Sequence, residues 1–375
     1  MVEIKEVKTK SDIKKFVAFP NKLYKGNKYY VPFLNIDEIN KFDKKKNESY
    51  DDCIIKCFLA YKNGEIVGRI AAIIQKLYNE KVNEKRIRFS RFDSINDEKV
   101  STALFSAVEN WAKEQGMEII HGPMGYNDLD REGLLIEGFD HLSTFEEQYN
   151  YDYYAELIEK YGFKKEVDWL EYRITIPKEP VERVDRAAEI VSKRYKLKIV
   201  EPKTIKSFIK QYKDQIFETL DAAYSHLYGV VPISDKVKDA TIDQFKLILK
   251  KDFIVGVLNE KEELIAFGLI FPSFSEAVNK SKGKLFPFGI IRMLKQINKP
   301  KNIDLGLIAI KPEYQNKGVN TMMMSCLTKK MIKLGVQYAE TNLMLEDNSR
   351  IQSQWEIYEY IQHKRRRSYV KEVAK

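Results

Sequence analysis

Hydrophobic and polar positions alternate with two periods along this chain, and together they predict a protein of mixed strands and helices. Alternation with period two predicts strands at residues 55–61 and 66–75, joined by an Asn-Gly turn. Apolar residues at helical spacing predict helices at residues 100–114 and 321–334. The same criteria predict strands at residues 3–7, 87–92, 118–121, 169–176, 197–200, 253–258, 264–272 and 303–310, and helices at residues 153–161, 205–228 and 290–297.

The predicted elements occur twice in the same order. Residues 100–119 align with residues 319–338 without a gap, and in both segments a glycine ends the helix. Three collinear matches of this kind are hard to obtain by chance, so they predict two copies of one fold. The two shorter matches join residues 6–13 to 201–208 and residues 58–68 to 253–266.

The repeat predicts the domain organisation. We expect one copy at residues 1–176, a Pro-containing linker at residues 177–190 and a second copy at residues 191–375. Because the linker is short and both sheets have edges that need covering, the two copies are expected to pack as one rigid unit.

The second copy carries an insertion between its hairpin and the strand at residues 303–310. The offset between the copies grows from 198 residues at Glu65 and Glu263 to 219 at Val100 and Val319, a difference of 21. The inserted segment, residues 273–300, contains the predicted amphipathic helix. That helix is either a lid over a substrate groove or, as is more common, an ordinary packing helix.

Composition limits the function classes. The net charge of +9 comes from lysines scattered among glutamates, which is typical of a solvated surface, and no nucleic-acid-binding motif accompanies it. No apolar run is long enough to span a membrane, and the first residues do not resemble a signal peptide, so a cytoplasmic location without a membrane partner is expected. Three cysteines and four histidines show no disulfide or metal-ligand spacing, and no metal is expected. The basic cluster at residues 363–367 is interpreted as the rim of a last strand that begins at residue 368.

The turn after the strand at residues 303–310 has the features of a phosphate site. It contains Gly318, which lets a ligand approach the backbone, and it leads directly into the N-terminus of a helix that Asn320 or Thr321 is expected to cap. At the equivalent place the first copy has Asn96-Asp-Glu-Lys99, without a glycine and with two carboxylates that repel phosphate. The phosphate site is therefore predicted in the second copy only.

This segment resembles the acyl-CoA signature of the GNAT superfamily of N-acyltransferases, [Q/R]-x-x-G-x-[G/A] after a hydrophobic strand. Gln315 and Gly318 match the signature, and Asn320 departs from its last position. The resemblance implies an α/β (α+β) fold of two tandem GNAT-like domains, each a mixed, mostly antiparallel sheet flanked by helices, with a degenerate first copy. It also implies acetyl-CoA or another acyl-CoA as co-substrate, bound by Ile308, Ala309, Ile310, Gln315, Asn316, Lys317, Gly318, Val319, Asn320, Thr321 and Asn348.

The GNAT reaction needs a base for the amine and an acid for the leaving thiolate. The candidate bases are Asp304 and Glu340, on successive predicted strands. Tyr358 is the candidate acid, although the resemblance places Trp355 at the usual tyrosine position. The acceptor amine is expected between the copies, against the insertion and a polar loop at residues 122–133 that is otherwise a solvated turn. The substrate-binding candidates in this loop are Asn127, Asp128, Asp130, Arg131 and Glu132.

Three functions remain open on these residues. The first is acyl transfer from CoA to a primary amine of a small molecule or peptide, by a monomer or homodimer. The second is a non-catalytic acyl-CoA-binding protein, which the tryptophan at position 355 favours. The third is a Fem-type aminoacyl transferase, which uses paired GNAT-like copies and aminoacyl-tRNA.

Overall fold

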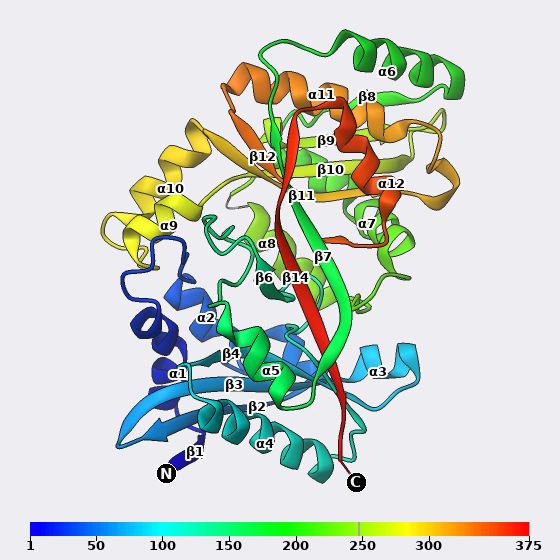
Figure 1. Ribbon diagram of the computed structural model, residues 1–375. Coiled ribbons are helices and arrows are strands. Elements are labelled where there is room, and N and C mark those ends of the chain that lie inside the picture. Colours follow the sequence, from blue (N-terminus) through cyan, green and yellow to red (C-terminus); the bar gives the residue numbers. More distant parts are fainter. Residues whose placement is uncertain (247, 375) are drawn as a thin grey trace.

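All strands of the described residues join one continuous sheet. We describe a computed structural model for residues 1–246 and 248–374 (Figure 1). The sheet has fourteen strands, twelve of them in the order β1-β2-β3-β4-β5-β14-β7-β12-β11-β10-β9-β8, with β6 beside β14 and β13 beside β7. The strands are β1 (Val2–Glu6), β2 (Cys53–Lys62), β3 (Glu65–Gln75), β4 (Arg86–Ser94), β5 (Ile119–Gly122), β6 (Leu134–Glu137), β7 (Lys164–Thr175), β8 (Lys198–Val200), β9 (Ile254–Leu258), β10 (Leu264–Pro272), β11 (Asn302–Ile310), β12 (Tyr338–Glu340), β13 (Met344–Leu345) and β14 (Tyr360–Glu372).

Helices cover both faces of this sheet. No described helix is long and apolar enough to cross a membrane. The α-helices are α1 (Lys10–Leu23), α2 (Asn35–Lys41), α3 (Lys76–Val82), α4 (Glu98–Glu114), α5 (Tyr153–Lys160), α6 (Glu182–Tyr195), α7 (Ile205–Tyr224), α8 (Asp235–Lys246), α9 (Ser275–Ser281), α10 (Gly289–Asn298), α11 (Val319–Leu334) and α12 (Ser349–Gln352). Short 3-10 helices lie at Glu48–Asp51, Lys251–Phe253, Pro312–Tyr314 and Ser353–Ile357.

The first half buries both faces of β1–β5. Successive residues of β3 point to opposite faces: Ile70 and Ala72 pack under α4 and α5, while Ala71 and Ile73 pack under α1. The hairpin β2–β3 is antiparallel, and β4 and β5 are parallel because α4 crosses over between them.

The second half repeats this arrangement. The hairpin β9–β10 is antiparallel, β11 and β12 are parallel, and α11 crosses over between them. Helix α11 covers one face of the sheet through Met323 and Leu327, while α7 covers the other face through Phe217 and Leu220. The predicted fold class, an α/β fold of two tandem copies with mixed, mostly antiparallel strands flanked by helices, is confirmed, and the strands of both copies join one sheet.

The two halves exchange their last strands. Strand β14, from the C-terminal end of the chain, lies between β5 of the first half and β7. Strand β7, from the first half, pairs with β12 of the second half. The ranges 1–176 and 191–375 therefore do not divide the sheet into two separate sheets. The range predicted as a linker, residues 177–190, contains the first part of α6.

The basic cluster at residues 363–367 lies inside β14, not on a rim before it, so that interpretation was wrong. Lys364 and Arg366 are buried because carboxylates from neighbouring strands neutralise their charge, and His363 is buried beside them. Arg366 Nε donates to Glu171 Oε1 of β7 at 2.6 Å. Arg367 on the same strand forms a two-pronged pair with Asp168 of β7, at 2.8 and 3.0 Å.

Candidate active site

Strand β11 changes its pairing at Gly306. On one side a bulge interrupts its register with β10, since Gly268 pairs with Ile308 but Ile270 pairs with Leu305. On the other side β11 pairs with β12 only over Asn302–Asp304. The backbone edge of β11 beyond residue 305 thus has no strand partner on the β12 side, which leaves polar groups there to hydrogen-bond with side chains or a ligand.

The loop between β11 and α11 presents an uncapped helix N-terminus. Asn316 and Gly318 adopt left-handed backbone conformations, with φ of 60° and 78°. Gly318 is the N-cap residue of α11, no side chain caps the helix, and its first turn contains no acidic residue. The predicted cap by Asn320 or Thr321 is wrong, because both residues lie inside the first turn of α11, where the Asn320 amide donates to Gln354 Oε1. The N–H groups of the first turn therefore keep their positive potential for an anion.

The equivalent helix of the first half supplies its own anion. Asp97 is the N-cap of α4, and its carboxylate accepts a hydrogen bond from the Lys99 backbone N–H at 2.9 Å. The same carboxylate pairs with Lys62 at 2.7 Å. A second carboxylate, Glu98, lies in the first turn. This N-terminus is occupied by the protein itself and does not suit a phosphate.

Gly318 also has a packing role. Helix α6 lies against α11, and a Cβ on Gly318 would come within 2.7 Å of the Val191 Cγ2 atom of α6. Asp185 of α6 accepts a hydrogen bond from Ser325 and pairs with Lys329 at 3.0 Å. Substitutions at Gly318 therefore affect helix packing as well as any ligand, and a test must separate the two effects.

Two carboxylates meet on adjacent strands, where Asp304 of β11 is in register with Glu340 of β12. Burial, and then the charge of Glu340, raises the pKa of Asp304 well above its usual range. Burial would raise the pKa of Glu340 too, but the charge of Lys364 and a hydrogen bond with His363 outweigh burial and lower it. The pKa values of the two carboxyl groups are thus shifted in opposite directions, that of Asp304 upward and that of Glu340 downward, and Asp304 Oδ1 has no hydrogen-bond partner.

Glu340 is held by three basic side chains. Its Oε2 lies 2.9 Å from both His363 Nε2 and Lys364 Nζ, which come from β14. Its Oε1 accepts a hydrogen bond from Arg173 of β7 at 3.0 Å. Both exchanged strands therefore converge on this carboxylate, which positions it and limits its freedom to act as a base.

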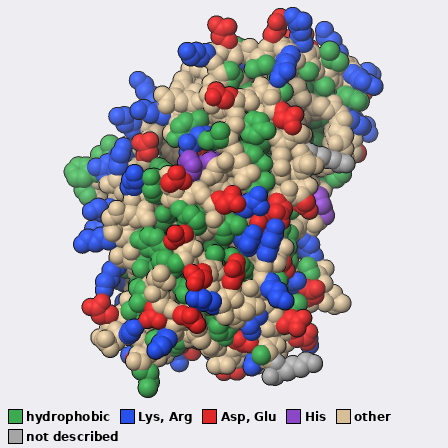
Figure 2. All heavy atoms as spheres, in the orientation of Figure 1, with side chains coloured by type: hydrophobic (Ala, Val, Ile, Leu, Met, Phe, Trp, Pro, Cys, Tyr) green, Lys and Arg blue, Asp and Glu red, His purple; other side chains and the backbone are tan. Residues whose placement is uncertain are grey.

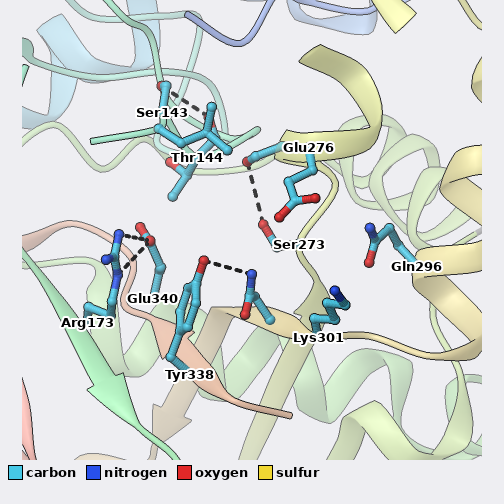
Figure 3. A pocket seen from close by; sticks show the side chains of 12 residues that line it. Ser143, Thr144, Arg173, Ser273, Glu276, Gln296, Lys301, Tyr338 and Glu340 are labelled. Carbon is cyan, nitrogen blue, oxygen red and sulfur yellow. Dashed lines mark hydrogen bonds and ion pairs between the residues drawn. The ribbon is translucent and has the colours of Figure 1, made fainter. Parts of the chain in front are cut away.

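A polar pocket of about 30 Å³ opens above this carboxylate (Figure 3). One wall comes from the first half and the other from the insertion between β10 and β11. The acceptor site was predicted between the copies, against the insertion and residues 122–133. The insertion lines this pocket, but residues 122–133 do not. The lining residues are Leu142, Ser143, Thr144, Arg173, Ser273, Ser275, Glu276, Gln296, Lys301, Asn302, Tyr338 and Glu340.

Asp130, predicted to bind substrate, is already neutralised by the protein. It accepts two hydrogen bonds from Arg91, at 2.8 and 2.9 Å, and pairs with Lys41. Burial alone would raise its pKa, but the charges of Arg91 and Lys41 outweigh burial and hold it well below the usual range. This carboxylate supports the fold of the loop and has no free position for an amine.

The other candidates in this loop also have partners within the protein or are buried. Arg131 stacks on Phe33 and donates to the Phe145 carbonyl oxygen. Asn127 Oδ1 accepts from the Leu129 backbone N–H at 3.0 Å. Asp128 Oδ1 accepts from the Val231 backbone N–H, and Glu132 is buried with an unpaired Oε1 and a pKa raised well above its usual range by burial. The loop contacts the segment between α7 and α8, so it joins the two halves.

An apolar cavity of about 50 Å³ lies on the α7 face of the second half. Leu307 of β11, one residue beyond Gly306, and Leu129 of the loop at residues 122–133 both line it. The sequence does not reveal this cavity, because a helix stripe that lines a cavity has the same period as one that packs tightly. The remaining walls come from Phe208, Ile209, Lys213, Ile216, Phe217, Leu220, Thr241, Ile242, Phe245, Leu249, Ile254, Phe267 and Leu269.

Tyr358, the predicted acid, lies in the core beside Trp355. Its hydroxyl is 3.0 Å from Thr328 Oγ1 of α11, and burial raises its pKa. Asn348 lies just before α12, and its backbone N–H bonds to the Leu345 carbonyl. Among the described residues, no three His, Cys, Asp or Glu side chains are grouped to hold a metal ion.

Comparisons with known proteins extend this picture. No protein-family model matches the chain. The Escherichia coli (strain K12) protein named YghO is 29% identical over 374 residues, which cover 97% of this chain and 94% of that protein. A Caulobacter vibrioides protein named bacterial ceramide synthase is 25% identical over 354 residues, covering 91% of this chain and 90% of its own length.

Solved structures show the same architecture. A tandem GNAT protein from the clavulanic acid biosynthesis pathway superposes with a TM-score of 0.59 at 9% identity and covers 100% of this chain and 99% of its own. A GCN5-related N-acetyltransferase from Sphaerobacter thermophilus gives a TM-score of 0.53 at 9% identity, covering 100% and 96%. The chain therefore has the tandem GNAT fold, which is the fold of known acetyltransferases.

Proposed function

We propose that the protein transfers an acyl group from acyl-CoA to a primary amine, and that the second half alone binds the CoA. The observation that carries this proposal is the contrast between two equivalent helix N-termini. At α11 the N-terminus is uncapped and follows a left-handed glycine, whereas at α4 the carboxylate of Asp97 caps it. A pyrophosphate fits the first and is repelled by the second.

The residues around β11 suit the other parts of the reaction. Bound acyl-CoA would supply an activated thioester. Backbone N–H groups of β11 beyond the bulge at Gly306 are free of a strand partner on one side and would polarise a carbonyl oxygen. Asp304 lies two residues before the bulge and is in register with the pocket residue Glu340, although it does not line the pocket itself. Once ionised, it would accept a proton through water from an ammonium group bound in the polar pocket. Glu340 is already paired with Arg173 and with Lys364 of β14, so its role would be to fix one wall of this pocket rather than to bind the ammonium.

The proposal is tested by titrating CoA into the protein and by measuring thiol release with a panel of amines. Calorimetry should show one site. Gly318→Asp should abolish binding, while Lys99→Asp in the first half should leave it unchanged. The double variant Gly318→Ala with Val191→Ala separates packing from charge, because Val191→Ala on α6 makes room for the new Cβ. This variant should keep most of the CoA affinity that Gly318→Asp loses. Gly335→Ala is the matched control for backbone strain, since Gly335 ends the same helix at φ 72° with no atom near its missing Cβ.

We infer as a second candidate that the accepted amine carries a long apolar chain. The cavity on the α7 face has apolar walls and reaches Leu307, next to the bulge where the thioester would lie. One relative of similar length is named bacterial ceramide synthase, and a ceramide is an amide of a long-chain amine. With straight-chain amines of increasing length, kcat/KM should rise by about fourfold per methylene until the cavity is full. Leu307→Phe should shorten the preferred chain, and no dependence on length would refute this candidate.

The two alternatives have separate signatures. A non-catalytic acyl-CoA-binding protein would bind CoA at the α11 site but release no thiol with any amine. A Fem-type transferase would need aminoacyl-tRNA and would be insensitive to Gly318→Asp. For the acyltransferase we expect a small-molecule or peptide amine as acceptor, and a monomer or homodimer, which sedimentation velocity distinguishes.

A further inference from the structure

The insertion between β10 and β11 carries a concentrated patch of exposed apolar side chains. Phe286, Phe288, Ile291 and Leu294 are 73%, 62%, 61% and 50% exposed, and Ile290 is 38% exposed. Elsewhere in the described chain, large exposed hydrophobic residues occur singly or as a pair. A patch of this density on a soluble surface indicates a docking site.

The opposite face of α10 anchors it to the body of the protein. Met293 and Ile297 pack into a cluster with Val31 and Leu34 of the first half. The preceding helix α9 is fixed by Asn279, whose amide donates to the Tyr30 carbonyl oxygen at 2.6 Å. The helix therefore packs against the body of the protein, and Gln296 on it also lines the polar pocket. Its outward face stays apolar although its inner face is already packed.

The segment that carries this patch is basic. Residues 277–303 contain seven Lys and Arg residues and no Asp or Glu. Lys280 pairs with Glu276, but Lys282, Lys284, Lys295 and Lys299 have no ion pair within the described part of the chain. Figures 1 and 2, drawn in the same orientation, show α9 and α10 projecting from one edge of the molecule, where hydrophobic side chains lie among Lys and Arg side chains. Apolar side chains beside lysines on one helix are the signature of a helix that lies in a membrane interface.

We propose that the α9–α10 insertion docks the protein on the surface of an anionic lipid bilayer. Phe286, Phe288, Ile291 and Leu294 enter the headgroup region, and Lys284, Lys295 and Lys299 contact anionic headgroups. This peripheral contact differs from the sequence expectation of no membrane partner, which rested only on the absence of a spanning segment. Gln296 and Lys301 of the same insertion line the polar pocket, so docking brings that pocket to the lipid surface. The proposal does not depend on the acyl transfer.

Binding is measured by co-sedimentation with vesicles of equimolar phosphatidylcholine and phosphatidylglycerol, against vesicles of phosphatidylcholine alone. The wild type should bind the mixed vesicles and lose binding as salt increases. Ile291→Glu with Leu294→Glu should lower the partition coefficient at least about tenfold. Ile190→Glu is the control, because Ile190 is 64% exposed on α6, away from the insertion.

Charge is tested by Lys295→Glu with Lys299→Glu, which should reduce binding by about fivefold or more for each lysine at low salt. Lys206→Glu with Lys210→Glu is the control, since this pair has the same spacing on the exposed face of α7. A direct reporter is Ile291→Trp, whose emission should shift to the blue with mixed vesicles, because the three native tryptophans are buried.

Three results would overturn the proposal. The first is equal binding to both kinds of vesicle. The second is an equal loss in the α10 variants and in their controls. The third is a wild-type dimer that Ile291→Glu with Leu294→Glu converts to a monomer without changing vesicle binding, which would assign the patch to a second copy of this chain.

Discussion

The exchanged strand β14 is expected to hold the two halves together through buried ion pairs, and Arg366→Met tests this. Arg366 is fully buried, and it bridges Glu171 of β7 and the carbonyl oxygen of Gln148 in the first half. Methionine keeps much of the side-chain volume but removes the charge and both hydrogen bonds. Glu171 would then remain buried with Lys364 as its nearest cation, at 3.6 Å.

The magnitude follows from the buried charge that is left behind. Removing one partner of a buried pair costs about 3–5 kcal/mol in the free energy of unfolding. Because Lys364 still neutralises part of Glu171, we expect about 3 kcal/mol. Replacing both partners, Arg366→Met with Glu171→Leu, removes the uncompensated charge and should recover most of this loss. The coupling energy between the two substitutions should therefore be about 2–3 kcal/mol.

Urea unfolding followed by tryptophan fluorescence measures these free energies. The three tryptophans report on different places: Trp111 on the first-half core, Trp169 on β7 and Trp355 on the second-half core. Arg186→Met is the matched control, because Arg186 and Glu182 form an exposed pair on α6 that should contribute less than about 0.5 kcal/mol. If Arg366→Met costs no more than Arg186→Met, or if the double variant is as unstable as the sum of the single ones, the buried pair does not stabilise the sheet.

Three further predictions concern acid stability, the base and the connection between the halves. Burial lowers the pKa of His121 to about 4. Its contribution to the free energy of unfolding, up to about 3 kcal/mol, is therefore complete above pH 6.5 and is lost as the pH falls toward 4. Thermal melts of His121→Phe should lose this pH dependence, and those of the exposed His226→Gln should keep it. Because burial raises the pKa of Asp304, kcat/KM should rise as the pH increases through that pKa. Asp304→Asn should lower kcat by about 10²–10⁴-fold and remove the acidic limb of the pH profile. Glu276→Gln, the control, should do neither. After trypsin cleavage at the exposed Lys178, both fragments should elute in one size-exclusion peak until denaturant is added, because β7 and β14 cross between the halves. Separation of the fragments in native buffer would contradict the strand exchange.

The elements that the sequence predicted well are those whose signal is local. The hairpin β2–β3 and the helix α11 each carry their period within their own residues, so both were predicted close to their observed bounds. The first part of β14, residues 360–367, carries no such signal. Arg366 is buried by a partner 195 residues away, and without that partner a run of basic residues indicates a solvated surface.

The same limit applies to the candidate site. The loop at Gly318 was predicted from its own residues, and whether it binds CoA stays a prediction. Asp304 and Glu340 were proposed as independent bases, but they lie in register across β11 and β12, and their pKa values are shifted in opposite directions. Asp130 was read as a free carboxylate because its partners, Arg91 and Lys41, lie 39 and 89 residues away.

The strand exchange explains why a half without a phosphate site is part of this protein. Strand β7 of the first half covers the edge of β12, which would otherwise be open to pairing with another chain, and brings Arg173 to Glu340. The first half also supplies residues 142–144 to the polar pocket and residues 31–34 to the anchor of α10. Each of these contacts needs the two halves in one fixed orientation, and a continuous sheet gives that orientation more firmly than a linker does. The first half therefore acts on the candidate site as a wall and a support, which are roles that do not require it to bind a ligand of its own.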